Sequence, residues 1–104
     1  MLATELLGLR KPPTALFVCN NLMTVGALAG LHQRGLRVPG DVAVVGFDDL
    51  PWAEALDPPP TVVRQPAYEV GRQAMELLLK RIMDPERPPV TVRLRPELVV
   101  RRST

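Results

Sequence analysis

Three polar side chains stand directly after apolar runs that are typical of buried strands. They are Asn20 after residues 15–19, Asp48 after residues 42–47, and Gln65 after residues 61–64. In an open parallel sheet, ligands bind outside the carboxyl ends of the strands, and these side chains would lie there. Carboxylate and amide groups can bridge neighbouring hydroxyls with paired hydrogen bonds. Residue type and position therefore predict a site for a small molecule rich in hydroxyl groups.

Each of these residues also has a purely structural explanation. Asn20 or its neighbour Asn21 could serve only to cap the next helix, because an asparagine side chain accepts from free N–H groups of a first turn. Asp48 could serve only to close a turn, and Gln65 could serve only to precede Pro66. Position along the chain leaves the ligand-binding and structural roles open.

The residues needed for catalysis or metal binding are sparse. Asp48 and Asp49 are adjacent, so in an extended segment they point to opposite sides and cannot form a facing acid–base pair. Cys19 and His32 lie on different predicted elements without an evident orienting carboxylate. One histidine and one cysteine cannot complete a zinc site. We expect no enzyme activity, no metal and no cofactor, and we expect Cys19 to be a buried, inert thiol.

Charge and composition describe an ordinary globular chain. It has 104 residues, 46% hydrophobic and 23% charged, with a formal net charge of +2. This length suits one domain or part of one, and no apolar run is long enough to span a membrane. Residues 93–102 carry four arginines. A basic tail could contact phosphate, although a solubilising terminal strand explains it better, because no aromatic residues alternate with the arginines.

Strand-like and helix-like patterns alternate along the chain. The order predicts an α/β fold with parallel pairing and right-handed crossovers. Expected helices lie at residues 1–9, 22–34 and 66–83, a helical turn at 50–56, and strands at 15–19, 42–47, 61–64, 90–94 and 98–100.

Two of the expected helices carry apolar stripes. On the helix at 22–34 the stripe consists of Leu22, Val25, Leu28, Ala29 and His32. Large apolar side chains on the helix at 66–83 would stabilise the fold substantially if buried. We expect this second stripe to be covered, either by the chain's own sheet or, preferably, by a second copy of the chain.

Four segments occur in an informative order. They are residues 13–21 (PTALFVCNN), 41–49 (DVAVVGFDD), 58–66 (PPPTVVRQP) and 96–104 (PELVVRRST). Together with the helix at 22–34 and the Gly-Leu-Arg-Val-Pro sequence that follows it, they resemble segments of the LacI/GalR family of bacterial transcription regulators. The resemblance covers nearly the whole chain in order.

The resemblance implies a fragment of a type I periplasmic-binding-protein-like fold with α/β/α layers. Such a core has two lobes, binds a sugar, nucleoside or purine between them, and follows a helix-turn-helix headpiece that reads operator DNA. The chain matches only the last third of that plan. Residues 13–65 and 95–104 would belong to the C-terminal lobe and residues 66–94 to the N-terminal lobe, with the DNA-binding headpiece absent.

The resemblance also assigns roles to particular residues. The family's ligand contacts fall on Asn20, Asp48 and Gln65, and Val25 and Leu56 fall on positions of its dimer interface. Asn21 stands where the family usually has an aspartate, and Pro60 replaces a usual leucine.

The implied protein is a cytoplasmic, homodimeric regulator that senses a sugar or nucleoside-like effector and does not enter membranes. Binding would close the lobes and change operator affinity, with DNA contacted only through the headpiece. The alternative is a fragment of a sugar-binding protein of a transport system, which has the same fold. An enzyme of unrelated α/β class is a third possibility.

Overall fold

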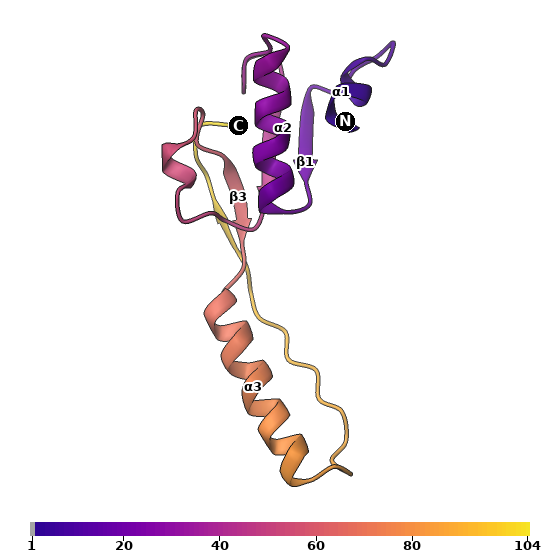
Figure 1. Ribbon diagram of the computed structural model, residues 1–104, viewed down its shortest axis with the longest axis vertical. Helices are drawn as coiled ribbons and strands as arrows, with labels where there is room; N and C mark the ends of the chain where they lie inside the picture. Colours follow the sequence, from indigo (N-terminus) through magenta and orange to yellow (C-terminus); the bar gives the residue numbers. More distant parts are fainter. Residues whose placement is uncertain (1) are drawn as a thin grey trace. The chain divides into compact units, whose positions relative to one another are not determined.

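The computed structural model describes residues 2–104 (Figure 1). The chain divides into two compact units. The first takes in the described residues up to Arg64 together with Leu98–Thr104, and the second is Gln65–Glu97. Among the described residues no helix is long and apolar enough to cross a membrane.

The first unit is built on parallel strands, which confirms the predicted α/β class. Its elements are α1 (Leu2–Leu7), β1 (Ala15–Val18), α2 (Asn21–Gln33), β2 (Ala43–Phe47), the 3-10 turn η1 (Ala53–Ala55) and β3 (Thr61–Arg64). Strand β4 (Glu97–Val99) lies beside β3 at the sheet edge, in the order β1-β2-β3-β4. Both β1–β2 and β2–β3 pair in parallel.

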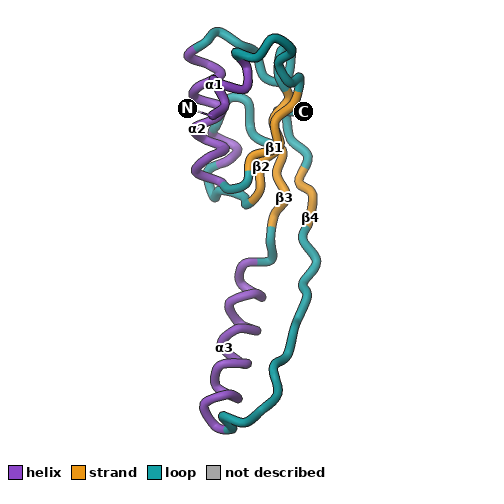
Figure 2. Tube along the Cα trace, turned by 90° about the vertical axis from the view of Figure 1, so that its right-hand side faces the viewer, coloured by secondary structure: helices purple, strands orange, loops and turns teal. Residues whose placement is uncertain are grey.

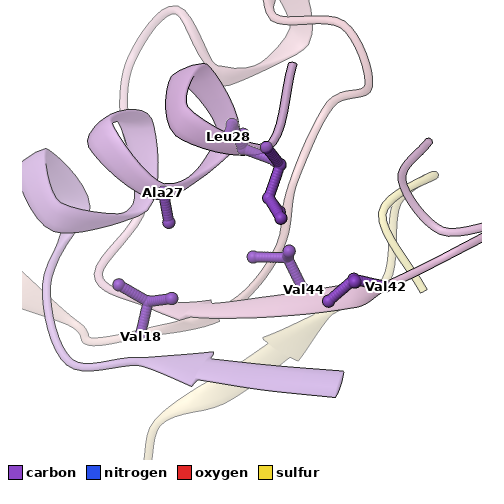
Figure 3. Close-up of a cluster of buried hydrophobic side chains, with 6 residues drawn as sticks. Val18, Ala27, Leu28, Val42 and Val44 are labelled. Carbon is purple, nitrogen blue, oxygen red and sulfur yellow. The ribbon is translucent and has the colours of Figure 1, made fainter. Parts of the chain in front are cut away.

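The core of this unit lies between α2 and the first two strands (Figure 3). Leu31 and Val44 are both fully buried there. Val18, Ala27, Leu28 and Val42 complete the buried cluster. Figure 2 shows α1 and α2 on one side of β1 and β2. Because α2 is the one described helix that packs against the strands, this unit holds two of the three expected layers.

The buried face of α2 differs from the predicted stripe. Leu22 is 74% exposed, and Ala29 and His32 are exposed as well. The buried residues of the helix are Thr24, Ala27, Leu28, Gly30 and Leu31. Apolar and small residues occur all around this helix, so periodicity alone could not select the face that meets the sheet.

Strand β1 is not buried on both faces, as its apolar sequence had predicted. Val18 faces the core, whereas Phe17 is 61% exposed and contacts Phe47 edge to face on the other side of the sheet. The predicted burial of Cys19 is also wrong, because this thiol is exposed. A strand can be buried on both faces only where other elements pack on both sides of its sheet. Within the described residues, elements pack on only one side of this sheet.

Close packing between α2 and β2 depends on Gly46. A Cβ atom at this position would lie 2.5 Å from Thr24 Oγ1 and 3.0 Å from Thr24 Cγ2. Thr24 cannot easily move, because it is 1% exposed and its hydroxyl donates to the Asn20 carbonyl (2.8 Å). A glycine in this strand therefore lets the helix approach.

We expect Gly46→Ala to lower the free energy of unfolding by about 1–3 kcal/mol, the usual cost of overpacking. Chemical denaturation of the 104-residue chain measures this. The matched control is Gly26→Ala in α2, where an added Cβ meets no atom within 4 Å. An alanine at that helical position should leave stability unchanged or raise it by about 0.5–1 kcal/mol. A Gly46→Ala chain as stable as the parent would contradict the close approach.

The second unit consists of α3 (Ala67–Met83) and an extended segment after it. Residues 90–94 are not a strand, contrary to prediction, because they pair with no other strand among the described residues. Prolines at 88, 89 and 96 flank the segment and lack the N–H groups that a ladder needs.

Helix α3 has no buried residue. Its large apolar side chains are exposed, among them Met75 (55%), Leu78 (52%) and Ile82 (66%). The expected cover for this stripe is therefore not supplied by the chain itself, and cover by a second copy stays a prediction. The polar side of the helix is linked by ion pairs of Arg72 with Glu69 (2.6 Å) and Glu76 (3.4 Å).

Candidate functional site

The register of the strands brings two of the predicted site residues to one end of the sheet. Val18 pairs with Gly46, so Asn20 and Asp48 each follow a paired position by two residues. Phe47 pairs with Val63, which places the end of β3 at the same edge. Asn20 and Asp48 therefore lie at the shared carboxyl edge of parallel strands, where ligands bind in such sheets.

Asn20 caps α2, as one of its two interpretations predicted. Its Oδ1 accepts a hydrogen bond from the Met23 N–H (2.8 Å), and its backbone carbonyl accepts from the Thr24 N–H (3.0 Å). The cap uses the amide oxygen. The amide nitrogen has two N–H donors in addition, so capping fixes this side chain at the sheet edge without using its capacity to donate.

Asp48 adopts a left-handed backbone conformation with φ of 70°. This conformation costs a non-glycine residue on the order of 1 kcal/mol and persists where the surroundings impose it. The Asp48 N–H donates to the Val63 carbonyl (2.9 Å), which ties the end of β2 to β3. Aspartate and asparagine adopt this conformation more readily than other non-glycine residues, so the backbone at Asp48 is compatible with both of its interpretations, turn closure and ligand contact.

Gln65 is the first residue of the second unit and follows the last residue of β3 directly. Its side chain is exposed, and its backbone carbonyl accepts from the Ala67 N–H (2.9 Å) at the start of α3. Its position in the chain is the one predicted, at the carboxyl end of a strand.

Sequence reasoning missed the pairing of Asp49 with Arg101, a largely buried ion pair next to the site. Arg101 donates from NH1 to Asp49 Oδ1 (2.9 Å) and from NH2 to Asp49 Oδ2 (2.7 Å). Their side chains are only 13% and 10% exposed. The basic tail was interpreted as a solubilising strand, and this is wrong for Arg101. The two residues stand 52 positions apart, so no local pattern signals the pair.

The hydrogen bonds from Arg101 hold the pKa of Asp49 below its ordinary value of 3.8, and the Leu50 N–H and the charge of Arg64 act in the same direction against partial burial. A carboxyl whose pKa is lower folded than unfolded stabilises the fold above its unfolded pKa. This stabilisation is lost as the pH falls below about 4 and through the lowered folded value.

We therefore expect Asp49→Asn to reduce the denaturation midpoint strongly at pH 7 and only slightly near about pH 2, where the parent chain is protonated too. Other lowered carboxyls, such as Asp41 and Glu69, are common to both proteins and cancel in the difference. A gap between the two midpoints that does not narrow with acidification would contradict the assignment.

The last residues of the chain are built into the sheet. Ser103 is fully buried; its hydroxyl donates to the Val44 carbonyl (2.5 Å) and accepts from the Thr61 N–H (2.7 Å). Its own carbonyl accepts from the Val44 N–H (2.8 Å). The Arg101 N–H donates to Thr61 Oγ1 (2.9 Å). These bonds carry Arg101 to the position from which it contacts Asp49.

The two residues assigned to a dimer interface lie in different surroundings. Val25 is half-buried on α2, beside the face that packs on the sheet. Leu56 follows η1 and packs against the hydrophobic core cluster. Leu56 therefore contributes to the fold of the chain itself, whatever it contacts in an assembly.

An apolar hollow of about 380 Å³ lies elsewhere in the first unit, among α1, β1 and α2. Its lining includes Leu6, Phe17, Cys19 and Met23 and is nearly free of polar surface. Such a lining does not suit a hydroxyl-rich molecule, so the chemistry favours the polar sheet edge at Asn20 and Asp48 over this apolar hollow.

Comparison with known proteins agrees with this geometry. Residues 2–104 match the model of the periplasmic binding protein-like domain family. The HTH-type transcriptional repressor PurR of Vibrio parahaemolyticus is 39% identical over 99% of the chain and 31% of that protein. The chain thus spans about a third of the length of the curated relatives it matches.

Solved structures of transcriptional regulators share the fold. A LacI family regulator from Enterococcus faecium with bound ribose is 32% identical, with a TM-score of 0.84 over 99% of this chain and 38% of that one. A LacI family regulator from Arthrobacter sp. FB24 in complex with lactose is 34% identical, with a TM-score of 0.81 over 98% and 38%. The chain belongs to the periplasmic binding protein-like domain family and represents the part of it found in LacI/GalR-type transcriptional regulators.

Proposed function

We propose that the chain forms part of the effector-binding core of a transcriptional regulator and that it recognises a sugar or nucleoside-like molecule. The observation that carries this proposal is Asp48, held in a left-handed conformation at the carboxyl edge of parallel strands. A carboxylate there can accept from two neighbouring hydroxyls, while Asn20, whose amide oxygen caps α2, can donate from its amide nitrogen at the same edge. Gln65 would add a third contact.

Two related regulators whose bound ligands are known support the same class of effector. The regulators from Enterococcus faecium and Arthrobacter sp. FB24 hold ribose and lactose. Both are rich in hydroxyls, which matches the hydrogen-bonding groups at the sheet edge. Ligand binding would shift the equilibrium between two arrangements of the lobes. The size of the shift is set by the difference between the ligand's affinities for the two arrangements.

A regulator accounts for the comparisons better than the alternatives do. The matched proteins are named as transcriptional repressors and regulators, which disfavours a transport component. Repressors are not enzymes, so we infer a binding function without catalysis. A transcriptional regulator of this kind binds DNA in the cytoplasm, and we infer a cytoplasmic location for this protein. Operator binding would come from a helix-turn-helix headpiece, which these 104 residues do not include.

The proposal is tested by titrating the ¹⁵N-labelled chain with ribose, lactose and a nucleoside while following backbone amide signals. At least one of these ligands should shift the signals of Asp48 and Asn20 and leave those of the buried core near Leu31 in place. Binding should be weak, because the chain spans only part of the relatives' length. If none of the three moves the Asp48 signal at millimolar concentration, the proposed site is wrong.

We further infer that the chain self-associates through the surface around Val25 and Leu56. Val25→Asp should shift the sedimentation profile toward monomer, because a carboxylate without a partner is costly to bury. The control is Leu22→Asp on the same helix, at a side chain that is 74% exposed and outside the proposed surface. A parent chain that sediments as a monomer at every concentration would rule this interface out.

A further inference from the structure

The backbone around Asp48 is held on both sides. On one side β2 leads into it, and its N–H donates to the Val63 carbonyl (2.9 Å). On the other side stands Asp49, whose carboxylate is engaged on both oxygens. A left-handed conformation costs an aspartate less than most residues, and neighbouring contacts that hold the backbone on both sides stabilise it further. Asp49 directly follows Asp48, and its contacts can restrain the Asp48 backbone from the C-terminal side.

The Asp49 carboxylate makes four contacts with three residues. Oδ1 accepts from Arg101 NH1 (2.9 Å) and from the Leu50 N–H (2.9 Å), and Oδ2 accepts from Arg101 NH2 (2.7 Å). Arg64 NH1 adds a longer ionic contact to Oδ2 (3.5 Å). The two parallel bonds from one guanidinium restrict both the position and the plane of the carboxylate.

Arg101 is itself fixed at several atoms. Its Nε donates to Glu54 Oε1 (2.6 Å), and its NH1 also donates to the Pro60 carbonyl (3.0 Å). Its backbone N–H donates to Thr61 Oγ1 (2.9 Å). The guanidinium is thus anchored to η1, to the entry of β3 and to the last residues of the chain. It provides a fixed reference against which Asp49 is oriented.

We propose that Arg101 is a positioning residue for the effector, and that it sets the direction of the Asp48 carboxylate by clamping Asp49. The proposal rests on the ligand role of Asp48 and adds a residue that need not touch the ligand. Arg101 fixes Asp49, Asp49 fixes the peptide that follows Asp48, and that peptide keeps Asp48 left-handed at the sheet edge. Sugar recognition then depends on a contact from the chain's last residues.

The first test is made without ligand on the ¹⁵N-labelled 104-residue chain. Arg101→Lys retains the charge but cannot donate two parallel bonds, because an ammonium lacks the planar fork of a guanidinium. We expect hydrogen exchange at the Asp48 amide to accelerate by about tenfold through local opening. The HN–Hα coupling of Asp48 should change as well. Amides of the core near Leu31 and Val44 should exchange as in the parent.

Arg37→Lys is the matched control. Arg37 also binds an aspartate through two nitrogens, from Nε and NH2 to Asp41 (3.2 and 3.1 Å). Its side chain is 80% exposed and lies away from the sheet edge. This variant should leave the Asp48 amide unchanged. Unchanged exchange and coupling at Asp48 in a folded Arg101→Lys chain would overturn the proposal.

Asp49→Asn provides a second variant, since it removes the charge and keeps the side-chain shape. If Arg101→Lys loses its fold, Asp49→Asn must accelerate exchange at Asp48 for the proposal to stand. Global unfolding of both variants would assign the pair a purely structural role and overturn it.

Ribose then separates the positioning role from the proposed function. At one fixed millimolar concentration, the ribose-induced shift at Asp48 should be several-fold smaller in Arg101→Lys than in the parent and in Arg37→Lys. An equal shift in all three chains would overturn the positioning role even if the loop had loosened. A parent chain that does not respond to any ligand of the panel would refute the effector site, while the exchange result would still decide whether Arg101 holds Asp48.

Discussion

Replacing Asp48 with alanine is expected to weaken sugar binding by about 10- to 100-fold. A hydrogen bond between a carboxylate and a hydroxyl is worth roughly 1.5–3 kcal/mol, which corresponds to that range of dissociation constants. The measurement is calorimetry on a chimera in which residues 2–104 replace the matching part of the ribose-bound Enterococcus faecium regulator. The chimera supplies the remainder of the site that this chain does not span.

Asp57→Ala is the matched control for this experiment, because Asp57 is an exposed aspartate of the same unit, outside the strand ends. It should bind ribose as the unmodified chimera does. Asp48→Asn is informative as well: it tolerates the left-handed backbone but lacks the charge. An Asp48→Ala chimera with the affinity of the parent would remove Asp48 from the site.

Ser103→Ala is expected to destabilise the first unit by about 2–4 kcal/mol. The substitution leaves the Val44 carbonyl and the Thr61 N–H without their side-chain partner in a fully buried position. Each unsatisfied buried group costs about 1–3 kcal/mol. Since a small domain has only about 5–15 kcal/mol of net stability, the denaturation midpoint should fall far.

Arg102→Ala, at the exposed position next in the chain, serves as the control and should change the midpoint little. Ser103→Cys keeps a side chain of similar size with a weak donor and should fall between serine and alanine. A Ser103→Ala chain as stable as Arg102→Ala would mean that water satisfies both backbone groups.

Local patterns were enough to predict most elements of the fold. Alternating apolar runs and helical segments placed β1, β2, β3 and α3 to within one or two residues. Gly35 takes the left-handed conformation that a glycine commonly supplies at the end of a helix. These features depend on residues close together in the chain, which is why a single sequence reveals them.

The features that sequence reasoning missed depend on partners far away in the chain. The buried face of α2 is decided by the strands it meets, since the helix itself is apolar on all sides. Within the described residues, helix α2 packs on one face of the sheet and the other face has no covering helix, which leaves Phe17 exposed. The Asp49–Arg101 pair joins residues 52 positions apart, so neither residue is recognisable from its neighbours.

The burial of Ser103 has a kinetic consequence. Its bonds to Val44 and Thr61 close stretches of 59 and 42 residues, and the whole second unit lies within both of them. The entropic cost of closing a loop rises with its length, and non-local contacts slow folding. During synthesis on the ribosome, α2 and the first three strands can assemble as they emerge. Strand β4 and Ser103 come late in this segment and can join the sheet only after they have been synthesised. Until then, the β3 edge of the sheet in the nascent chain has no neighbouring strand.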